Sequence, residues 1–342
     1  KMFNKYKPGE AIVRFRGDME SKNTVMRDPV LFRIIDARHP LLLDKYRVWP
    51  SYDFAVAIED SMDGITHAFR SKEYELRNEL YYAILDALNM RKPKMLEFSR
   101  LEFKGMPVSK RIIRPLMEKG KVSSLDDPRL PTLAALLRRG ITPEAIRKFT
   151  KSLGFTKADT LAPFDSLEAF NRTIIDKTSI RLFMVRKPKI LTINNLPNSV
   201  IELPNHPSND LGTRQVKIEN GVLLSSEDVK ELEVGSQLRL MGLGNVKITS
   251  IKSEITGEFT SDDHNVNFRK VQWVSQKTAH KLKILIPHQL FIDDEFNEGS
   301  LEEIHAYTEP HYLELKEGTE IQFVRFGYCR KDSVNQAIFT HK

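Results

Sequence analysis

The chain has 342 residues and a formal net charge of +7, from 53 Lys and Arg against 46 Asp and Glu. Its length suits two or three domains, and no apolar run approaches the roughly 20 residues that a membrane helix needs, so we expect no membrane contact. Its single cysteine, Cys329, excludes an intrachain disulfide and a cysteine-rich metal site, so we expect a reducing, cytoplasmic location and no protein-bound metal.

The charge is unevenly distributed along the chain. Residues 1–50 hold 11 basic and 6 acidic side chains, and residues 101–150 hold 11 and 5, whereas residues 51–100 and 179–342 each have a net charge of −2. Ordinary solvated surface accounts for most such excesses. Clustering into two blocks that contain turn signals and paired arginines favours contact with phosphates.

The first hundred residues predict strands and two helices. Alternating residues at 11–18 and 29–34 indicate strands, and the apolar run Tyr52–Ile58 indicates a short buried strand, with Asp60 or Ser61 placed to cap a helix after it. Apolar residues repeat every four positions from Glu73 to Leu88, which predicts a helix, and residues 94–98 predict another strand. This strand–helix–strand order is typical of a parallel α/β sheet.

The remaining residues change from helical to β-type at about residue 179. Residues 131–140 predict a helix ended by Gly140, and Thr142-Pro143 predicts the start of another. Short β-type runs separated by Gly, Pro and Asn then indicate barrels or sandwiches: 190–193, 237–241, 245–251, 271–274, 283–287 and 320–326.

A series of short motifs occurs in a fixed order. They are Tyr52-Asp53-Phe54-Ala55, Gly64-Ile65-Thr66-His67, Glu97-Phe98-Ser99-Arg100-Leu101, Val108-Ser109-Lys110-Arg111, Asp126-Asp127-Pro128-Arg129 and Leu137-Arg138-Arg139-Gly140. Together they resemble the glutamyl/glutaminyl-tRNA synthetase family, with 108–111 as its KMSKS-type loop. The resemblance extends to Val271-Gln272-Trp273-Val274-Ser275 and Phe326-Gly327-Tyr328, and so covers essentially the whole chain.

The resemblance implies ATP-dependent formation of an aminoacyl-adenylate, with Mg-ATP as the substrate complex. Negative charge builds on the phosphates during that step, and a positioned ammonium stabilises it. The resemblance gives this catalytic role to Lys110. It places Val108, Ser109, Arg100 and Leu101 against the nucleotide, and Ser71 near the ribose. Pro107 stands where the consensus has its first lysine.

Two positions favour glutamate over glutamine as the amino acid. Arg70 stands where glutaminyl enzymes have a small neutral residue, and a guanidinium suits a γ-carboxylate better than an amide. Met95 stands where those enzymes tend to have Gln. Tyr52 is expected to line the same pocket. A structural ion pair for Arg70 and a core position for Met95 are the alternatives.

The other class I motif, His-x-Gly-His, does not occur in the sequence. In the family this motif precedes all the segments found here, so we expect the chain to lack the first half of the catalytic fold. That half would then be its partner, and the chain alone would show no glutamate-dependent ATP–pyrophosphate exchange.

The resemblance predicts a multidomain protein. Residues 1–50 become the remainder of an acceptor-end insertion domain, 51–111 the second half of a Rossmann-like class I α/β fold, 112–178 a helical stem-contact domain, and 179–342 two all-β anticodon-binding barrels. The proximal barrel is expected at about 179–285 plus 330–342 and the distal one at about 286–329. All-β anticodon domains imply the archaeal or eukaryotic type of glutamyl enzyme.

Several basic residues are expected to contact tRNA. Arg181 matches a family arginine at the anticodon, Arg138 and Arg139 are candidates for the inner side of the tRNA, and Arg239, Lys247 and Arg325 are weaker candidates. The expected partners are therefore tRNA(Glu), glutamate and ATP. Two alternatives stay open: a glutaminyl-tRNA synthetase, and a tRNA-binding module without catalysis.

Overall fold

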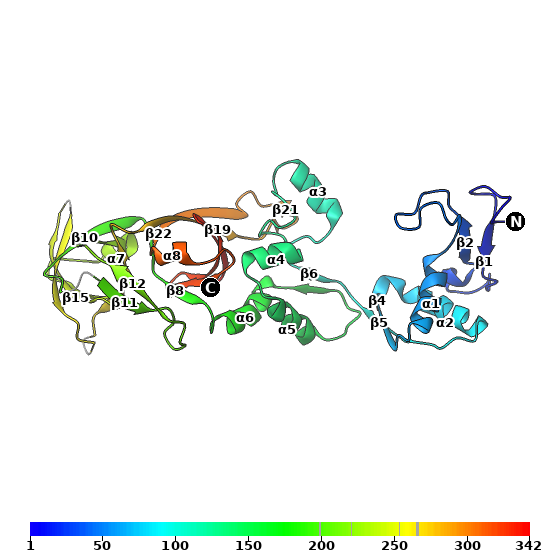
Figure 1. Cartoon of the computed structure of the whole chain (residues 1–342), viewed down its shortest axis with the longest axis horizontal. Coiled ribbons are helices and arrows are strands. Elements are labelled where there is room, and N and C mark those ends of the chain that lie inside the picture. The colour runs from blue at the N-terminus through cyan, green and yellow to red at the C-terminus, as the bar shows by residue number, and fades with distance from the viewer. Residues whose placement is uncertain (198–199, 220, 253, 265–266) are drawn as a thin grey trace. The chain divides into compact units, whose positions relative to one another are not determined.

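The computed structural model describes residues 1–197, 200–219, 221–252, 254–264 and 267–342, and it divides into two compact units (Figure 1). Unit 1 comprises Lys1–Leu101 with Leu153–Thr160. Unit 2 comprises Glu102–Ser152 with Leu161–Lys342. Each unit is described by itself.

Unit 1 combines a small antiparallel sheet with an α/β segment. The sheet has the order β1-β2-β3, and β4 pairs in parallel with β5, joined through a 3-10 turn and α2. The core contains Leu31, Ala57, Leu80, Ile84 and Leu85. The elements are β1 Ile12–Arg14, η1 Thr24–Met26, β2 Val30–Ile34, β3 Val48–Pro50, α1 Tyr52–Met62, β4 His67–Ser71, η2 Lys72–Arg77, α2 Asn78–Ala87 and β5 Lys94–Phe98.

The predicted strand–helix–strand order is present, but its first strand is not where the sequence pattern put it. Residues 52–58 form helix α1 rather than a buried strand, because the Ser51 hydroxyl accepts the Phe54 N–H and caps the helix at 51, not at Asp60 or Ser61. The strand is β4, fifteen residues later. The helix predicted at 73–88 begins with 3-10 turns, and its Leu80 and Ile84 are buried whereas Leu76 and Leu88 are exposed.

Unit 2 begins with short helices, as the sequence predicted. Thr142 caps α5 through its hydroxyl, which accepts the Ala145 N–H at 3.2 Å. Gly140 ends α4 with a φ of 94°, a conformation that favours glycine. The elements in chain order are β6 Leu101–Phe103, α3 Lys110–Glu118, α4 Leu133–Arg139, α5 Pro143–Leu153, β7 Thr160–Ala162 and α6 Phe164–Ile175, and β6 pairs with β7 in a two-stranded sheet.

Two seven-stranded, barrel-like sheets make up the rest of unit 2. The first has the order β17-β14-β15-β16-β10-β13-β18 and the second β8-β23-β24-β25-β19-β22-β9. The first sheet contains β10 Pro188–Asn194, β13 Gly221–Ser225, β14 Gln237–Leu240, β15 Gly244–Ile251, β16 Ile255–Ser261, β17 Arg269–Val271 and β18 Val274–Ser275. The second contains β8 Ile180–Leu182, β9 Met184–Arg186, β19 His280–Pro287, β22 Leu301–Thr308, β23 Glu320–Phe323, β24 Gly327–Ser333 and β25 Gln336–His341.

The strand pairing groups this region differently from the expected division at 179–285 plus 330–342 and 286–329. Strands β8 and β9 pair with β23 and β22, more than a hundred residues away, so the second sheet takes 180–186 together with 280–341. Such pairings leave no local signal in the sequence. The shorter elements here are β11 Val200–Pro204, β12 Thr213–Lys217, α7 Ser226–Val229, β20 Phe291–Ile292, β21 Glu295–Phe296 and α8 His311–Glu314.

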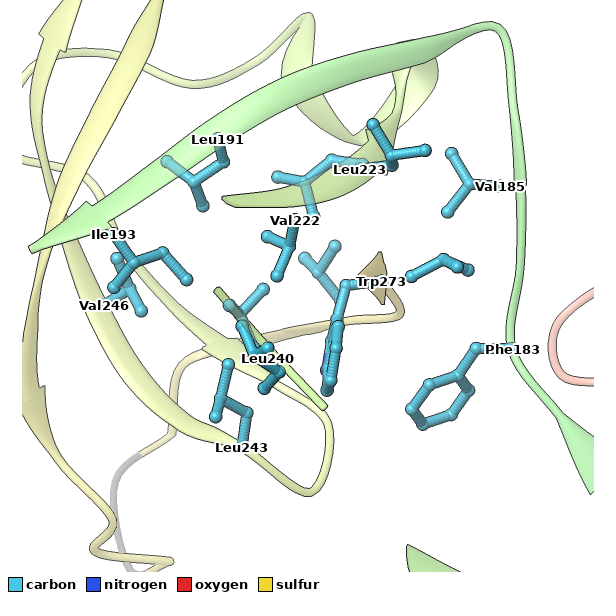
Figure 2. Close-up of a cluster of buried hydrophobic side chains, with 14 of the residues drawn as sticks. Phe183, Val185, Leu191, Ile193, Val222, Leu223, Leu240, Leu243, Val246 and Trp273 are labelled. Atoms are coloured by element: carbon cyan, nitrogen blue, oxygen red, sulfur yellow. The ribbon is translucent and has the colours of Figure 1, made fainter. Parts of the chain in front are cut away.

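The first sheet closes around a continuous apolar core (Figure 2). Trp273 is 1% exposed and packs with Leu240, Leu243 and Phe183, and its indole N–H donates to the Met241 carbonyl at 3.0 Å. Because a buried indole N–H needs an acceptor, this bond fixes the ring in the core. Trp273 is therefore a structural residue of the barrel-like sheet.

Candidate functional site

A pocket lies in unit 1 among α1, β4, α2 and β5. Tyr52 and Val56 reach it from α1, Arg70 from β4 and Met95 from the neighbouring β5. It is partly open to solvent, and its other lining residues are Asp53, Tyr74, Arg77, Asn78 and Tyr81. The structure therefore brings together Arg70 and Met95, the two residues that favour glutamate in the sequence, with Tyr52.

Arg70 is anchored in this pocket and keeps free donors. Its Nη2 donates to the Asp60 carboxylate at 2.7 Å and its Nη1 donates to the Tyr52 hydroxyl. Its side chain is only 12% exposed. A guanidinium has five N–H donors, and the other three have no partner among the described residues. A largely buried cation with unused donors suits a planar anion such as a carboxylate.

The rest of the pocket lining is charge-balanced and partly apolar. Arg77 is ion-paired with Asp53, and its guanidinium carbon lies 5.9 Å from the centre of the Tyr74 ring. Met95 contributes a thioether side chain and no strong donor or acceptor. A ligand amide would find no strong hydrogen-bonding partner in the Met95 side chain, which distinguishes it from Arg70.

The residues expected around the nucleotide fall into two groups, and the first is in unit 1. Arg100 Nε lies 3.3 Å from the Glu73 carboxylate, and a hydrogen bond from the Ser71 hydroxyl holds the pKa of Glu73 below its ordinary value. Leu101 follows directly and begins β6. Ser71 and Arg100 thus share Glu73 as a partner, and the Arg100 side chain is 65% exposed.

The second group lies in unit 2, at the start of α3. Ser109 is the N-cap residue, and its carbonyl accepts the N–H groups of Ile112 and Ile113 at 3.0 Å each. Val108 and Lys110 are exposed. In the described part of the chain, Lys110 has no hydrogen bond or ion pair, so its ammonium is available to a ligand.

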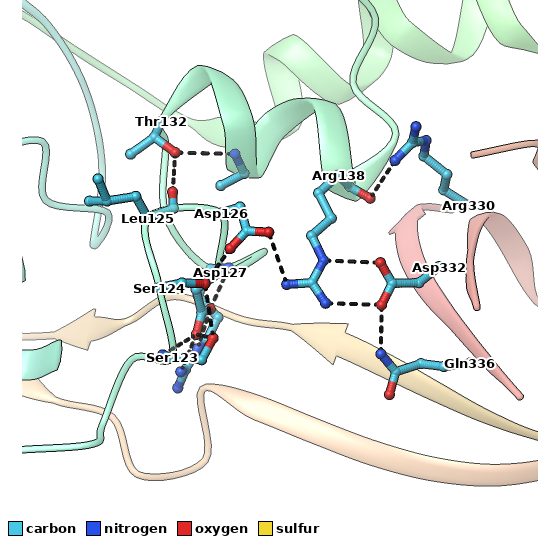
Figure 3. Close-up of polar contacts among 12 residues, drawn as sticks. Ser123, Ser124, Leu125, Asp126, Asp127, Thr132, Arg138, Arg330, Asp332 and Gln336 are labelled. Carbon is cyan, nitrogen blue, oxygen red and sulfur yellow. Dashed lines mark hydrogen bonds and ion pairs between the residues drawn. The ribbon is translucent and has the colours of Figure 1, made fainter. Parts of the chain in front are cut away.

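The two arginines expected on the inner side of the tRNA contact protein groups instead. Arg138 forms a bidentate pair with Asp332, both bonds at 2.9 Å, and lies 3.5 Å from Asp126 (Figure 3). Arg139 is 6% exposed and donates to Glu168 at 2.6 Å and to the Thr340 carbonyl at 3.1 Å. Burial lowers the pKa of Arg139 to about 10. Arg139 thus joins α4 to β25 and has no surface for a nucleic acid.

Arg181 and Arg239 also use their donors internally. Arg181 donates to the Asp176 carboxylate at 2.5 Å and to the Ser179 carbonyl at 3.2 Å, and its side chain is 11% exposed. Arg239 is 5% exposed and donates to Asn245 at 3.0 Å and to the imidazole of His264 at 2.6 Å. Arg239 therefore organises the loop that follows β16 and is not directed to solvent.

Lys247 and Arg325 are the two candidates that lie at the surface. Lys247 is an exposed residue of β15. Arg325 has a φ of 63° and lies 3.0 Å from the buried Asp228, to which Arg269 also donates at 3.1 Å. The side chains of Arg325 and Arg269 are 47% and 39% exposed, so Asp228 holds two accessible guanidinium groups.

Two features are absent from the part of the chain that the structure describes. No group of three or more His, Cys, Asp or Glu side chains there is arranged to hold a metal ion. No helix in the same residues combines the length and the apolar character needed to cross a membrane.

The sequence matches three known families in succession. Residues 1–177 match the catalytic domain of class I tRNA synthetases for E and Q, and residues 179–270 and 270–332 match two anticodon-binding domains of the same enzymes. The chain belongs to the class I glutamyl/glutaminyl-tRNA synthetase family. The barrel-like sheets thus fall in the anticodon-binding region of this family, and the pocket with Arg70 falls in its catalytic domain.

Among relatives, the chain is 68% identical over 342 residues to a glutamate–tRNA ligase of Nitrosopumilus maritimus and 59% identical over 341 residues to that of Cenarchaeum symbiosum. It is 35% identical over 338 residues to a probable cytoplasmic glutamate–tRNA ligase of Encephalitozoon cuniculi. These alignments cover 100%, 100% and 93% of this chain. The chain spans 60%, 60% and 52% of the length of these synthetases.

Sequence reasoning missed Asp60 as the partner of Arg70. Tyr52, Val56 and Asp60 are spaced four residues apart, which places them on one face of a helix. The signal was therefore available, but it becomes visible only when residues 52–62 are recognised as helical. The roles of Arg77 and Tyr81 in the pocket depend on α2 packing against α1 and had no local signal.

Proposed function

We propose that the protein bearing this chain is an ATP-dependent glutamate–tRNA ligase that acts through a glutamyl-adenylate. The observation that carries the proposal is Arg70, a largely buried guanidinium with three unused donors beside Tyr52 and Met95. A γ-carboxylate accepts charge-assisted hydrogen bonds from those donors, whereas the amide of glutamine brings no charge and gains no hydrogen-bonding partner from Met95. Tyr52 and Arg70 therefore form the glutamate side of the pocket.

In the proposed reaction, an oxygen of the glutamate α-carboxylate attacks the α-phosphorus of Mg-ATP. A new P–O bond forms, the bond to the β-phosphate breaks, and pyrophosphate leaves. Lys110 stabilises the charge that develops on the phosphates, and its freedom from protein partners supports this role. Val108 and Ser109 are proposed nucleotide contacts of unit 2. Ser71, Arg100 and Leu101 are proposed nucleotide contacts of unit 1. A ribose hydroxyl of tRNA then attacks the acyl carbon and AMP leaves.

The proposed nucleic-acid contacts are based on the two basic segments, residues 1–50 and 101–150, and on the exposed basic side chains. We propose that residues 1–50 contact the acceptor end, residues 112–178 the stem, and the barrel-like sheets the anticodon. Lys247 and Arg325 are exposed and suit direct contact. Arg181 reaches a base only by exchanging its bond to Asp176. Arg138, Arg139 and Arg239 act in this proposal by shaping the protein surface.

The proposal includes a second half of the catalytic fold, with the His-x-Gly-His motif, as the partner of these residues. It also assigns the protein to the cytoplasm. A non-catalytic tRNA-binding module is the second candidate, since unit 2 alone contains both barrel-like sheets. The free ammonium of Lys110 favours the ligase, because a binding module does not require it.

The deciding experiment is aminoacylation by the protein that joins this chain to the His-x-Gly-His half. Glutamate and glutamine are each tested with tRNA(Glu) and tRNA(Gln). We expect charging of tRNA(Glu) with glutamate and none with glutamine. Charging with glutamine would contradict the role of Arg70. Tight tRNA binding without charging by any of the four combinations would favour the binding module.

A further inference from the structure

A loop that follows β11 holds Arg181 in place. The main-chain N–H of Arg181 donates to the Asn205 carbonyl at 2.7 Å, and its Nη2 donates to the Asp176 carbonyl at 3.1 Å. The same Asp176 carbonyl accepts a hydrogen bond from Nε2 of His206 at 2.8 Å. Residues 205–212 therefore contact both the strand that carries Arg181 and the turn after α6 that supplies its partner.

His206 joins this loop to the end of α6 through both nitrogens of its ring. Nδ1 accepts the N–H groups of Ser208 at 3.1 Å and Asn209 at 2.9 Å, so the proton of the neutral ring lies on Nε2, which donates to Asp176. The Asn209 amide adds a bond to the Lys177 carbonyl at 2.8 Å. His206 is 5% exposed, so a buried side chain fixes the loop backbone and the Asp176 carbonyl relative to each other.

The carboxylate of Asp176 has a second partner besides Arg181. It accepts from the Tyr328 hydroxyl and from Nη2 of Arg181, the latter at 2.5 Å, and these two bonds hold the pKa of Asp176 below its ordinary value. The Nε–H of Arg181 has no partner among the described residues. The Asp176 side chain is 50% exposed, so Tyr328 and water satisfy its carboxylate when Arg181 turns its donors to a ligand.

We propose that His206 is a positioning residue for the recognition of an anticodon base by Arg181. Through Asp176 it fixes the direction in which the guanidinium leaves the protein, while Asn205 fixes the main chain of Arg181. A planar guanidinium held in one direction suits the hydrogen-bonding edge of one unstacked base better than the many orientations of a phosphate. The placement of Arg181 at the anticodon rests on the proposed function.

Two substitutions separate this role from a purely local one. In His206→Asn, the shorter amide oxygen takes the place of Nδ1 and accepts the loop N–H groups, but no donor reaches the Asp176 carbonyl. In His206→Gln, the amide nitrogen takes the place of Nε2 and donates to that carbonyl, but the loop N–H groups lose their acceptor. Positioning requires the bond to Asp176, so anticodon recognition should be impaired in His206→Asn and largely kept in His206→Gln.

The test measures, by fluorescence anisotropy, binding of the chain to an RNA hairpin with the anticodon loop of tRNA(Glu) and to hairpins with each anticodon base changed in turn. The readout is the Kd for the changed hairpin divided by that for the original one. We expect Arg181→Ala to lower this ratio about tenfold or more at one base position. His206→Asn should lower it at the same position about 3- to 10-fold, the usual worth of one hydrogen bond. His305→Asn, at an exposed histidine of β22, is the control and should leave the ratio unchanged.

The combined variant Arg181→Ala/His206→Asn decides whether the two residues act together. If the histidine acts through the arginine, the combined variant loses no more than Arg181→Ala alone. Additive losses, equal weakening of all hairpins, or a loss in His206→Gln as large as in His206→Asn would each overturn the positioning role. The binding assay needs no catalysis, so charging judges the proposed function separately. Charging with additive losses leaves the ligase standing, and non-additive losses without charging leave the positioning role standing.

Discussion

The arginine of the pocket in unit 1 and the buried arginines of unit 2 differ in where their remaining donors lie. Arg70 gives one donor to Asp60 and one to Tyr52, and it lines a pocket with three donors unused. Arg139 also has donors, on Nη1, with no partner among the described residues, but its side chain is 6% exposed and packed within its own fold. Arg239 is 5% exposed and donates to Asn245 and His264. In the sequence these residues look alike. Unused donors that line a pocket, rather than charge alone, distinguish an arginine that can bind a ligand from one that holds the protein together.

The largest expected effect tests the structural side of this comparison. Arg214→Met removes the partner of Glu309, and both side chains are at most 3% exposed. An unpaired buried carboxylate costs about 3–5 kcal/mol, so we expect the free energy of unfolding of the chain to fall by that amount in urea titrations. Arg186→Met, which breaks a pair between side chains 41% and 64% exposed, is the control and should change it by less than about 1 kcal/mol.

The ligand-binding side is tested first at Lys110. Lys110→Ala should lower glutamate-dependent ATP–pyrophosphate exchange by the joined protein about 10²- to 10³-fold, the usual loss for one electrostatic contact to a transition state. Its unfolding free energy should stay the same, because Lys110 is exposed and has no hydrogen bond or ion pair among the described residues. Lys119→Ala, at the other end of α3, is the matched control. Exchange retained by Lys110→Ala would remove the catalytic assignment.

Arg70→Ala is expected to weaken the binding of glutamate and not that of ATP. Loss of charge-assisted hydrogen bonds worth about 1.5–3 kcal/mol should raise the KM for glutamate about 10- to 100-fold and leave the KM for ATP unchanged. Arg70→Lys keeps the charge without the planar fork and should recover only part of the loss. Unchanged glutamate kinetics in Arg70→Ala would show that the pocket arginine is structural, like those of the barrel-like region.

A smaller effect concerns pH and the contact between α6 and β25. His341 is fully buried, and burial lowers its pKa to about 4 from an ordinary value of about 6.5. The folded state disfavours its protonation, so this contribution to stability is present above pH 6.5 and is lost as the pH falls towards 4. At pH 5.5 the loss is about 1 kcal/mol. When the pH falls from 7 to 5.5, the free energy of unfolding measured in urea should therefore decrease less for His341→Gln than for the unmodified chain. The difference between the two decreases should be about 1 kcal/mol.

The smallest expected effect is at Lys247. An exposed lysine that contacts a phosphate contributes uniformly to all sequences, so Lys247→Ala should weaken tRNA binding a few-fold and reduce the salt slope by about 1. Binding of cognate and non-cognate tRNA should change equally, as measured by anisotropy at several salt concentrations. A loss confined to the cognate tRNA would instead indicate that Lys247 contacts a base.

The sequence predicted most elements of unit 2 because their signals are local. Thr142-Pro143, Gly140 and the alternating β runs each specify a cap or a strand within a few residues. The strand predicted at 52–58 was wrong because a short apolar run fits a buried strand and a helix equally. The helix is decided by its N-cap, in which the Phe54 N–H donates to the Ser51 hydroxyl. Only the family resemblance distinguished Arg70 from the other arginines in the sequence. The hydrogen-bonding partners of an arginine often lie far along the chain, so the local sequence does not show which N–H groups remain unused.

The second sheet has a consequence for the order of folding during synthesis. Its strands β8 and β9 leave the ribosome first, but their partners β23 and β22 follow more than a hundred residues later. The strand pairs of the first sheet lie within residues 188–275 and can form while the chain is still growing, although Tyr307 and Val324 pack against its core only later. At roughly 5–20 residues per second, β8 and β9 wait on the order of ten seconds for their strand partners. Val185 of β9 can pack into the core of the first sheet in that time, but the edges of both strands stay unpaired, so this interval is when the nascent chain most needs protection from aggregation.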